Sequence, residues 1–540
     1  MHTQNLSETS SKHEVIVVGG GIAGLTATAY LARAKLKPLL LEKEEKCGGL
    51  ISSFEHEGFI YDGGIRATEN SGILLPMLDQ LKLNIEFTKN EISLGVEDQV
   101  IRIQSEENIT EYQNLLNSLY PESREEISEI VDQIKKITKY MEVQYSIKNP
   151  AFLDFKEDRK YLMKKILPWI IRYAYTVPKI SKLNMPVIPF LEKYTKNQSL
   201  IDMIAQHFFR DTPAYFALSY LKIYLDYRYP LGGTGVLPQK LAEYIQENGG
   251  TIQNNTLVTD IDAGKKVLTD SEGKKYDYEQ LIWAADLKSL YNLVDPDAFA
   301  DPKTKQAINQ RKQDLKDKLG NDSVITVYLA VNKDPNYFSE KSTGHFFYTP
   351  SRLGITSAGE TPTNADGSAI REWLGKFAAL STYEISIPAL RDPSLAPPGK
   401  TGLVISALFD FHLAKKIQSQ GWYEDFKHLW EKLLIDVLDG AIYPGLKDSI
   451  IHSFTSTPLS IEKRTANTHG AITGWAFTNH PMPAENRLCK IFSSTNTPIP
   501  NVVQAGQWCY SPSGLPISIL TGKIAADKAI SNLKKKHSQV

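Results

Sequence analysis

The amino-acid sequence predicts an α/β protein whose parallel sheet binds a dinucleotide. Residues 15–18 form an apolar, β-branched run, as a buried parallel strand requires. A glycine-rich loop follows, then a helix-forming segment at 22–35 and a second apolar run at 38–41 that ends in Glu42. Near the other end of the chain, residues 501–530 have the same order of strand, glycine turn and helix. We therefore expect both ends of the sequence to contribute to one cofactor site.

The glycine loop carries the spacing Gly-x-Gly-x-x-Gly at Gly19, Gly21 and Gly24. The first glycine allows a tight turn, the second lets the backbone approach a pyrophosphate, and the third lets helix and strand pack closely. The helix that starts there offers free N–H groups to the phosphates. Glu42 comes 18 residues after Gly24, where a carboxylate binds the ribose hydroxyls. The alternative, a glycine-rich turn without a ligand, is disfavoured because the whole strand–loop–helix–strand pattern is present.

Composition is that of an ordinary soluble protein. The chain has 540 residues, enough for two or more domains, with 42% hydrophobic and 23% charged residues. Its net charge of −1 gives no electrostatic basis for binding nucleic acid. The three cysteines, Cys47, Cys489 and Cys509, lack metal-ligand spacing, so we expect no metal site and a reducing, cytoplasmic location.

Both ends of the chain are polar. Residues 1–13 lack an apolar core, so we expect a flexible tail rather than a signal peptide. Residues 533–540 are expected to form a solvated basic tail. Because no run of 18 apolar residues is free of charges, the sequence predicts no membrane-spanning helix.

Further glycine-containing segments suit a flavin cofactor. Paired glycines at 46–50 would let the backbone approach the pyrophosphate or the flavin side of the cofactor. At 58–66, glycines would pass beneath a planar ring, and Arg66 would balance negative charge on a reduced flavin. A plain hairpin that turns at Asp62-Gly63 is the alternative for this second segment.

The middle and the end of the chain continue the pattern. The sequence predicts a helix over 236–248, a strand over 251–262 and a buried strand and turn over 281–286, for which a helix–strand pair without ligand contact is the alternative. The helix that opens at Gly514 would direct its positive end at the flavin pyrimidine, unless it is only a terminal packing helix. A second Gly-x-Gly-x-x-Gly behind a strand is absent, so we expect FAD without a separate NAD(P)H domain.

Taken together, these motifs resemble the phytoene desaturase-like branch of the FAD enzymes with the glutathione-reductase fold, a group related to the flavin amine oxidases. The matching blocks are 15–66, 229–262, 281–286, 456–475 and 502–530. The resemblance implies a glutathione-reductase-type Rossmann FAD-binding domain with an interleaved α+β substrate domain. The expected boundaries are 14–66, 229–290 and 481–532 for the discontinuous FAD-binding domain, and 67–228 and 291–480 for the substrate domain.

The resemblance also implies which residues hold FAD. The predicted cofactor contacts are Gly19, Gly21, Ile22, Ala23, Gly24, Glu42, Lys43, Lys46, Gly48, Gly49, Leu50, Gly64, Ile65, Arg66, Val258, Ala285, Gly506, Gln507, Gly514, Leu515, Pro516 and Ile517. Gln507 stands where most relatives have an acid that binds the ribityl chain. An amide keeps the hydrogen-bonding capacity and loses only the negative charge.

Residues 160–183 combine an apolar stripe at helical spacing with basic side chains, as in helices that lie on membranes. The stripe consists of Leu162, Ile166, Ile170, Tyr173 and Val177. Pro168 is expected to interrupt the helix. An ordinary helix packed on the protein core is the alternative. The resemblance favours membrane contact, since polyene substrates reside in bilayers.

The sequence identifies no catalytic residue. His207, Asp211, Asp226 and Arg228 lie in a segment rich in tyrosine and phenylalanine that is a candidate pocket lining, and His469 and Trp475 are equally ambiguous.

By resemblance, the expected function is that of an FAD-dependent oxidoreductase that transfers hydride at flavin N5 and acts on C–C or C=C bonds of an apolar polyene or lipid. Desaturation, saturation and isomerisation all stay open. A flavin amine oxidase is one alternative, weakened because Leu515 stands where those enzymes commonly have an aromatic residue. A non-catalytic prenyl-lipid binder like the Rab GDP-dissociation inhibitors is another, and the intact glycines and Glu42 argue against it.

Overall fold

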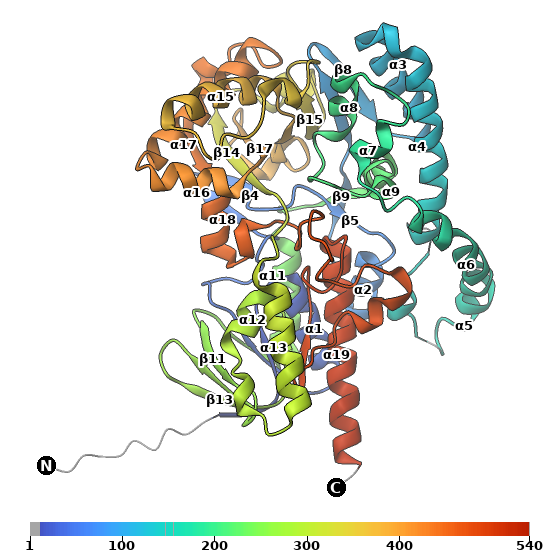
Figure 1. Cartoon of the computed structure of the whole chain (residues 1–540), viewed down its shortest axis with the longest axis vertical. Helices are drawn as coiled ribbons and strands as arrows, with labels where there is room; N and C mark the ends of the chain where they lie inside the picture. The colour runs from blue at the N-terminus through green and yellow to red at the C-terminus, as the bar shows by residue number, and fades with distance from the viewer. Residues whose placement is uncertain (1–10, 146, 155, 539–540) are drawn as a thin grey trace, which may run out of the picture.

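The computed structural model describes residues 11–145, 147–154 and 156–538, which form two bodies (Figure 1). The lower body in that view contains the first strand, β1 (Ser11–Val18), and the last helix, α19 (Leu515–His537). The chain crosses between the bodies several times, so that segments from the start, middle and end of the sequence meet in each. The expected fold class, an FAD-type Rossmann domain with an interleaved second domain, is confirmed.

A seven-stranded sheet organises the lower body. Its order is β10-β2-β1-β13-β12-β11, and β19 also pairs with β13. The other strands are β2 (Leu39–Leu41), β10 (Thr251–Gln253), β11 (Val258–Asp262), β12 (Val267–Asp270), β13 (Lys275–Trp283) and β19 (Val502–Gln504). Strands β10, β2, β1, β13 and β19 are parallel, whereas β11 and β12 form an antiparallel extension.

Helices cover both faces of this sheet. Successive side chains of a strand point to opposite faces, so an apolar strand can pack against helices on both sides. Val15 and Val17 face a cluster that contains the first group of helices, and Ile16 and Val18 face the second. The first group is α1 (Ile22–Arg33), α2 (Leu74–Leu81), α11 (Val236–Glu247) and α19, and the second is α12 (Leu287–Leu293) and α13 (Pro302–Lys316). Burial on both faces explains why the strands are continuous apolar runs.

The upper body contains a second seven-stranded sheet, in the order β18-β14-β17-β16-β15-β7-β8. Its strands are β7 (Ile92–Val96), β8 (Gln99–Ile103), β14 (Ser323–Val331), β15 (His345–Thr349), β16 (Tyr383–Ser386), β17 (Thr401–Phe409) and β18 (Ile450–Ser456). Helices α15 (Gly367–Leu380), α16 (Phe411–Ser419) and α17 (Tyr423–Gly440) share one apolar core with it.

A helical cluster packs beside the second sheet (Figure 1). It comprises α3 (Ile109–Leu119), α4 (Arg124–Tyr145), α5 (Arg159–Tyr161), α6 (Leu167–Ser181), α7 (Val187–Leu191), α8 (Gln198–Ala205), α9 (Ala214–Ala217) and α10 (Tyr220–Tyr224). Two shorter helices, α14 (Pro335–Ser339) and α18 (Pro458–Thr465), complete the upper body. Within the described part of the chain, every helix is too short or too polar to cross a membrane.

Two small sheets lie where the bodies meet. One is the hairpin of β3 (Ser53–His56) and β4 (Phe59–Asp62), and the other joins β5 (Thr68–Glu69), β6 (Phe87–Lys89) and β9 (Tyr227–Pro230). The hairpin therefore turns between His56 and Phe59 and not at Asp62-Gly63.

Four expectations about local structure need correction. Residues 11–13 of the expected tail extend β1 along β13, whereas residues 1–10 lie outside the described chain. The expected basic tail continues α19 to His537, because cations suit the last turn of a helix and Lys536 pairs with Glu279 at 2.6 Å. The segment 251–262 forms two strands with a break between them. Pro168 does not end its helix, because a π-helical turn over Leu162–Ile166 joins α5 to α6 and the helix continues to Ser181.

The expected domain boundaries also differ from the packing. Helix α2, within 67–228, belongs to the core of the lower body, where Gln80 accepts a hydrogen bond from Tyr30 at 2.8 Å. Helix α13 and Trp475, within 291–480, pack against the other face of the same sheet. The motifs mark where the chain touches the cofactor, but the apolar faces of the helices decide which body they join.

Candidate cofactor and substrate site

Each glycine of the first loop has a distinct geometric reason. Gly19 has a φ of 104°, and a methyl group on it would lie 2.8 Å from the Ala284 carbonyl oxygen. A methyl group on Gly24 would lie 1.9 Å from the Gly19 carbonyl oxygen, so only glycine lets α1 approach β1 this closely. At Gly21, by contrast, a methyl group would meet no described atom within 4 Å. The backbone at Gly21 thus faces open space.

That open space lies at the start of α1, in which a cofactor pyrophosphate fits. Gly21 is the N-cap, and none of the described side chains caps the helix. The first N–H groups of α1 are therefore free to donate to phosphate oxygens, and the helix dipole favours the negative charge. Gly48 donates from its backbone to the Gly20 carbonyl at 2.9 Å, which places the segment 46–50 against the same loop. The described residues therefore fit a bound dinucleotide.

Glu42 is held at the end of β2 by two backbone donors. Its Oε2 accepts from the Gly20 N–H at 2.5 Å and its Oε1 from the Glu44 N–H at 2.9 Å. Each carboxylate oxygen keeps a second lone pair, which suits a ribose hydroxyl. The Thr256 N–H donates to the Glu42 carbonyl at 2.8 Å, which brings the buried Val258 to this end of the site.

Four other residues predicted to contact FAD, Lys43, Lys46, Leu50 and Ile65, follow the first βαβ unit. Lys43 forms an ion pair with Glu44, and Lys46 is exposed. Ile65 donates from its backbone to the Leu50 carbonyl at 3.1 Å, so these two residues join the loops on either side of the hairpin.

The end of the chain is brought against the glycine loop. A methyl group on Gly506 would lie 3.3 Å from the Ala23 Cβ, and one on Gly19 would lie 3.1 Å from the Ala285 nitrogen. Gly522 allows α19 to pack closely on α1, because a methyl group there would lie 2.4 Å from the Ala23 carbonyl oxygen. The chain from Gly506 to Gly522 therefore packs against the start of α1.

Helix α19 begins with free donors as well. Its N-cap is Gly514, and no described side chain caps it, while Leu515 and Pro516 in its first turn are buried. The buried Ser513 hydroxyl, directly before it, has no hydrogen-bond partner among the described residues. Ile517 lies one turn along, where its carbonyl accepts from Thr521. These groups suit the polar edge of a flavin ring. Gln507, near this helix, packs against Gly474.

Arg66 lies at the boundary between the two bodies. Its guanidinium donates to the carbonyl of Gly64, to that of Asp62 at 3.0 Å and to the Ser406 hydroxyl on β17 at 2.9 Å. Its buried Nε has no partner among the described residues. Arg391 donates to the Arg66 carbonyl at 2.7 Å, so the buried Arg66 and the half-buried Arg391 both contact the loop that follows β4.

A carboxyl group that the sequence analysis did not single out lies beside the start of α19. A methyl group on Gly514 would lie 3.8 Å from Oε1 of Glu69. Burial, and secondarily the charge of Asp226, raises the pKa of Glu69 to about 7. Glu69 pairs with Tyr227 across β5 and β9, so only the long-range strand pairing places it there. A carboxyl group with a pKa near neutrality can both accept and donate a proton.

A small apolar hollow of about 60 Å³ lies in the upper body between the second sheet and the helical cluster. Its lining comprises Leu94, Gly95, Val96, Tyr112, Leu115, Leu116, Ile134, Met203, Ile204, His207, Phe208, Ala217, Leu218, Tyr220, Leu221, Tyr224, Phe347, Thr349 and Thr382. Burial lowers the pKa of His207 to about 4, which leaves its imidazole neutral at pH 7. Tyr227 donates to the Tyr220 hydroxyl at 3.3 Å, so the wall of the hollow adjoins the strand that pairs with Glu69.

Of the ambiguous residues, His207 alone lines the hollow. Asp226 accepts the backbone N–H groups of Asn70 at 3.0 Å and Ser71 at 2.8 Å, a structural role. Arg228 is exposed, and Asp211 lies in left-handed backbone at a turn. His469 and Trp475 bond to backbone groups, at Gly320 and Trp508.

The parallel sheet, the glycine cradle and the two adjoining helix starts define a Rossmann-type flavoenzyme. The chain belongs to the family described as flavin containing amine oxidoreductase, whose model matches residues 22–530. FAD is therefore its cofactor, and the protein is an FAD-dependent enzyme.

The chain is similar to two curated relatives over nearly its whole length. It is 24% identical to prolycopene isomerase from Daucus carota over 562 residues, covering 97% of this chain and 81% of the relative. It is 21% identical to all-trans-retinol 13,14-reductase from Danio rerio over 527 residues, covering 92% and 82%. These relatives confirm the resemblance to the phytoene desaturase-like branch.

Among solved structures, the fold matches an oxidoreductase from Methanosarcina mazei with a TM-score of 0.59 and 13% identity, covering 96% of this chain and 100% of the other.

Proposed function

We propose that the protein is an FAD-dependent oxidoreductase that acts on C–C or C=C bonds of an apolar polyene or a related lipid. The observation that carries the proposal is the apolar hollow, which adjoins the Glu69 region at the start of α19. The names of the two curated relatives, a carotenoid isomerase and a retinol reductase, support the same substrate class. When bound, FAD supplies the hydride acceptor or donor.

The lining of the hollow suits a hydrocarbon better than an amine. Its lining is mainly aliphatic and aromatic, and burying an apolar chain there gains roughly 25 cal/mol per Å². The lining that the structure describes contains no carboxylate, and its histidine is neutral. A protonated amine would lose its hydration without gaining a countercharge, which is costly. The amine oxidase alternative is therefore disfavoured.

Glu69 is our candidate for the group that handles the proton. Hydride transfer to or from a carbon–carbon bond leaves one proton to be removed or supplied. Oε1 of Glu69 lies beside the first turn of α19, and the pKa of about 7 leaves both protonation states populated at neutral pH. The carboxyl group can then hold the proton in one direction of the reaction and release it in the other.

We also propose that the protein is cytoplasmic and binds membranes peripherally through the segment 160–183. Exposed apolar side chains gather there: Met163, Leu167, Ile170, Ile171 and Tyr175. Of the predicted stripe, Ile166 is buried and Tyr173 packs against Trp169, so the exposed apolar face is rotated from the one expected. The proposed location in the cytoplasm rests on the low cysteine count.

The position of this helix supports delivery of a lipid substrate. Trp169 donates to the Val143 carbonyl on α4 at 2.5 Å, which fastens α6 to α4. Ile134, also on α4, lines the hollow. Helix α4 therefore contacts the exposed helix at Val143 and the hollow at Ile134. The six basic residues of the segment, Lys160, Lys164, Lys165, Arg172, Lys179 and Lys182, suit anionic headgroups.

Anaerobic spectroscopy tests the proposed function. Purified protein is loaded with FAD and mixed with candidate polyenes, both with the flavin oxidised and with it reduced by dithionite, and with amines as the comparison. A polyene is expected to bleach the oxidised flavin band near about 450 nm, to restore it in the reduced protein, or to be isomerised, as judged by chromatography. A response to amines alone would overturn the proposal.

A further inference from the structure

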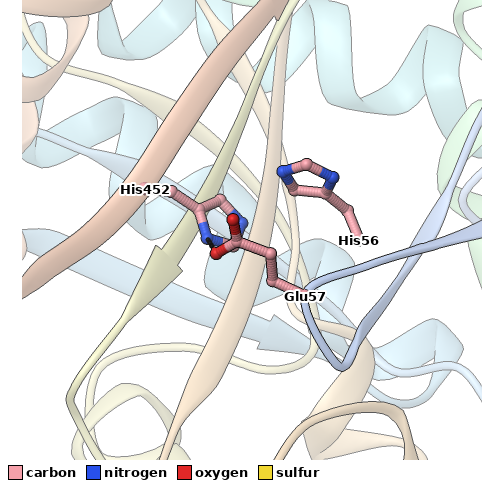
Figure 2. Close-up of side chains that lie close together, drawn as sticks. All are labelled: His56, Glu57 and His452. Carbon is pink, nitrogen blue, oxygen red and sulfur yellow. Dashed lines mark ion pairs between the residues drawn. The ribbon is translucent and has the colours of Figure 1, made fainter.

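Three side chains of types that can ligate a metal, from two distant parts of the sequence, converge at the hairpin of β3 and β4 (Figure 2). His56 ends β3, Glu57 begins the turn of the hairpin, and His452 lies on β18 of the second sheet. One ligand atom from each residue lies within 4.8 Å of the other two. Figure 2 shows the two imidazoles and the carboxylate directed toward a common space.

The hydrogen bonding of His452 leaves one ring nitrogen for a cation. Its Nε2 lies 3.2 Å from the Tyr61 hydroxyl, and its Nδ1 lies 3.0 Å from Oε2 of Glu57. That Nδ1 is buried and makes no hydrogen bond of good geometry with any described residue. If Nε2–H donates to Tyr61, the Nδ1 lone pair and a carboxylate oxygen face each other, an arrangement that needs a positive charge between them.

The surroundings of the two rings favour a fixed geometry. Tyr61 is fully buried, so it can hold His452 in one orientation, as outer partners of metal-bound histidines do. The rings of His56 and His452 are 4.8 Å apart at 88°, so they meet edge to face and do not stack. Phe454 flanks His56 at 5.1 Å and restricts its ring. Glu57 is 63% exposed, which gives an ion in solution access to the site.

We propose that His56, Glu57 and His452 form a binding site for a divalent transition-metal ion such as Zn²⁺. The two imidazoles make this set, completed by a carboxylate, suit Zn²⁺, Co²⁺ or Ni²⁺ better than Mg²⁺ or Ca²⁺. The remaining coordination positions go to water. The sequence analysis expected no metal site because it relied on cysteine spacing, whereas these ligands come together only in the fold.

The bound ion would fasten the hairpin to the second sheet. The hairpin leads directly into the loop of Gly64 and Arg66, next to the proposed flavin site, and β18 belongs to the upper body. The ion would thus connect the hairpin before the Gly64 and Arg66 loop to the upper body. This connection would add to the buried contact of Arg66 with Ser406. The site is independent of the proposed reaction.

Titration of chelator-treated, FAD-loaded full-length protein with Zn²⁺ tests the site by calorimetry, and Co²⁺ substitution reports the ligand field by visible absorption. We expect one Zn²⁺ per chain, with the affinity lowered at least tenfold in H56Q, E57Q and H452Q. Y61F is expected to lower it about tenfold or more, as loss of an outer partner does. H412Q is the matched control, since His412 and His469 form another imidazole pair at 5.0 Å, and it should bind Zn²⁺ as the wild type does.

Two results would overturn the proposal. One is that E57Q and H56Q bind Zn²⁺ with the same affinity as the wild type. The other is a Co²⁺ spectrum that H412Q abolishes and H452Q leaves unchanged. In either case the contact of His452 with Glu57 does not form a metal site. Because E57Q alters an exposed side chain, a folding failure of H452Q would not prevent the test.

Discussion

Gly21 and Gly24 offer a paired test of the cofactor cradle, because their substitution by alanine has opposite structural consequences. In G24A the new methyl group would lie 1.9 Å from the Gly19 carbonyl oxygen, so α1 must move away from β1. Such overpacking costs roughly 1–3 kcal/mol of folding free energy. In G21A the methyl group meets no described atom within 4 Å, and the φ of −67° and ψ of 175° suit alanine. We expect the unfolding free energy of apo G21A to stay within about 0.5 kcal/mol of the wild type.

FAD binding should be weakened directly in G21A, the variant whose stability is unchanged. The methyl group of G21A occupies the space in which the pyrophosphate would lie, and it keeps the phosphate oxygens from the N–H groups of α1. Losing one or two hydrogen bonds to a charged group costs roughly 3 kcal/mol. At about 1.4 kcal/mol per factor of ten, the dissociation constant for FAD rises about 100-fold.

The two properties are measured separately on apo protein. Urea denaturation followed by tryptophan fluorescence gives the unfolding midpoint, and quenching of flavin fluorescence on titration gives the affinity. The expected pattern is a stable G21A that binds FAD poorly and a destabilised G24A. Wild-type affinity in G21A would refute the placement of the pyrophosphate, and equal destabilisation of both variants would refute the reasoning from the open space.

Three further predictions concern the substrate side. E69Q should lower turnover at least tenfold and remove the pH dependence of turnover near 7. Folded Glu69 keeps its proton up to about pH 7, whereas the unfolded side chain loses it near 4.5, so the free energy of unfolding of the wild type should fall as the pH rises across that interval. Urea midpoints at several pH values should show this loss in the wild type and not in E69Q. I171E should weaken sedimentation with anionic vesicles about tenfold or more, whereas L353E, at a 59% exposed leucine elsewhere, should not. M203W should fill the hollow and raise KM for a polyene about tenfold without altering the flavin spectrum, and unchanged KM would argue against the hollow as the substrate site.

The cofactor half of the site could be predicted from sequence because its contacts are local. Gly19 to Gly24 and Glu42 act through backbone geometry and a strand end, and both are determined within one βαβ unit. The return of the C-terminal strand was predictable for the same reason, since Gly506 and the Gly514 helix form a second short motif. Their binding roles stay predictions that the FAD titration tests.

The substrate half could not be predicted, because its properties arise from long-range packing. Glu69 lies on a two-residue strand without a motif, and its pKa depends on burial and on Asp226. The hollow is lined from segments between Leu94 and Thr382, and none of those segments is distinctive by itself. The exposed face of α6 was misplaced because periodicity identifies an apolar stripe but not the side on which α4 packs.

The contacts of Arg66 indicate why the two bodies interleave rather than follow one another. The loop that would lie beside the flavin ring is short, and its arginine bonds to Ser406 on β17, while Arg391 donates to its backbone. The conformation of the loop therefore depends on residues of the upper body. Losing a hydrogen bond from a buried guanidinium costs roughly 1.5–3 kcal/mol, so separating the two bodies at this point is disfavoured. We infer that substrate enters through the helical cluster around α4 and α6, and not by opening of the boundary at Arg66.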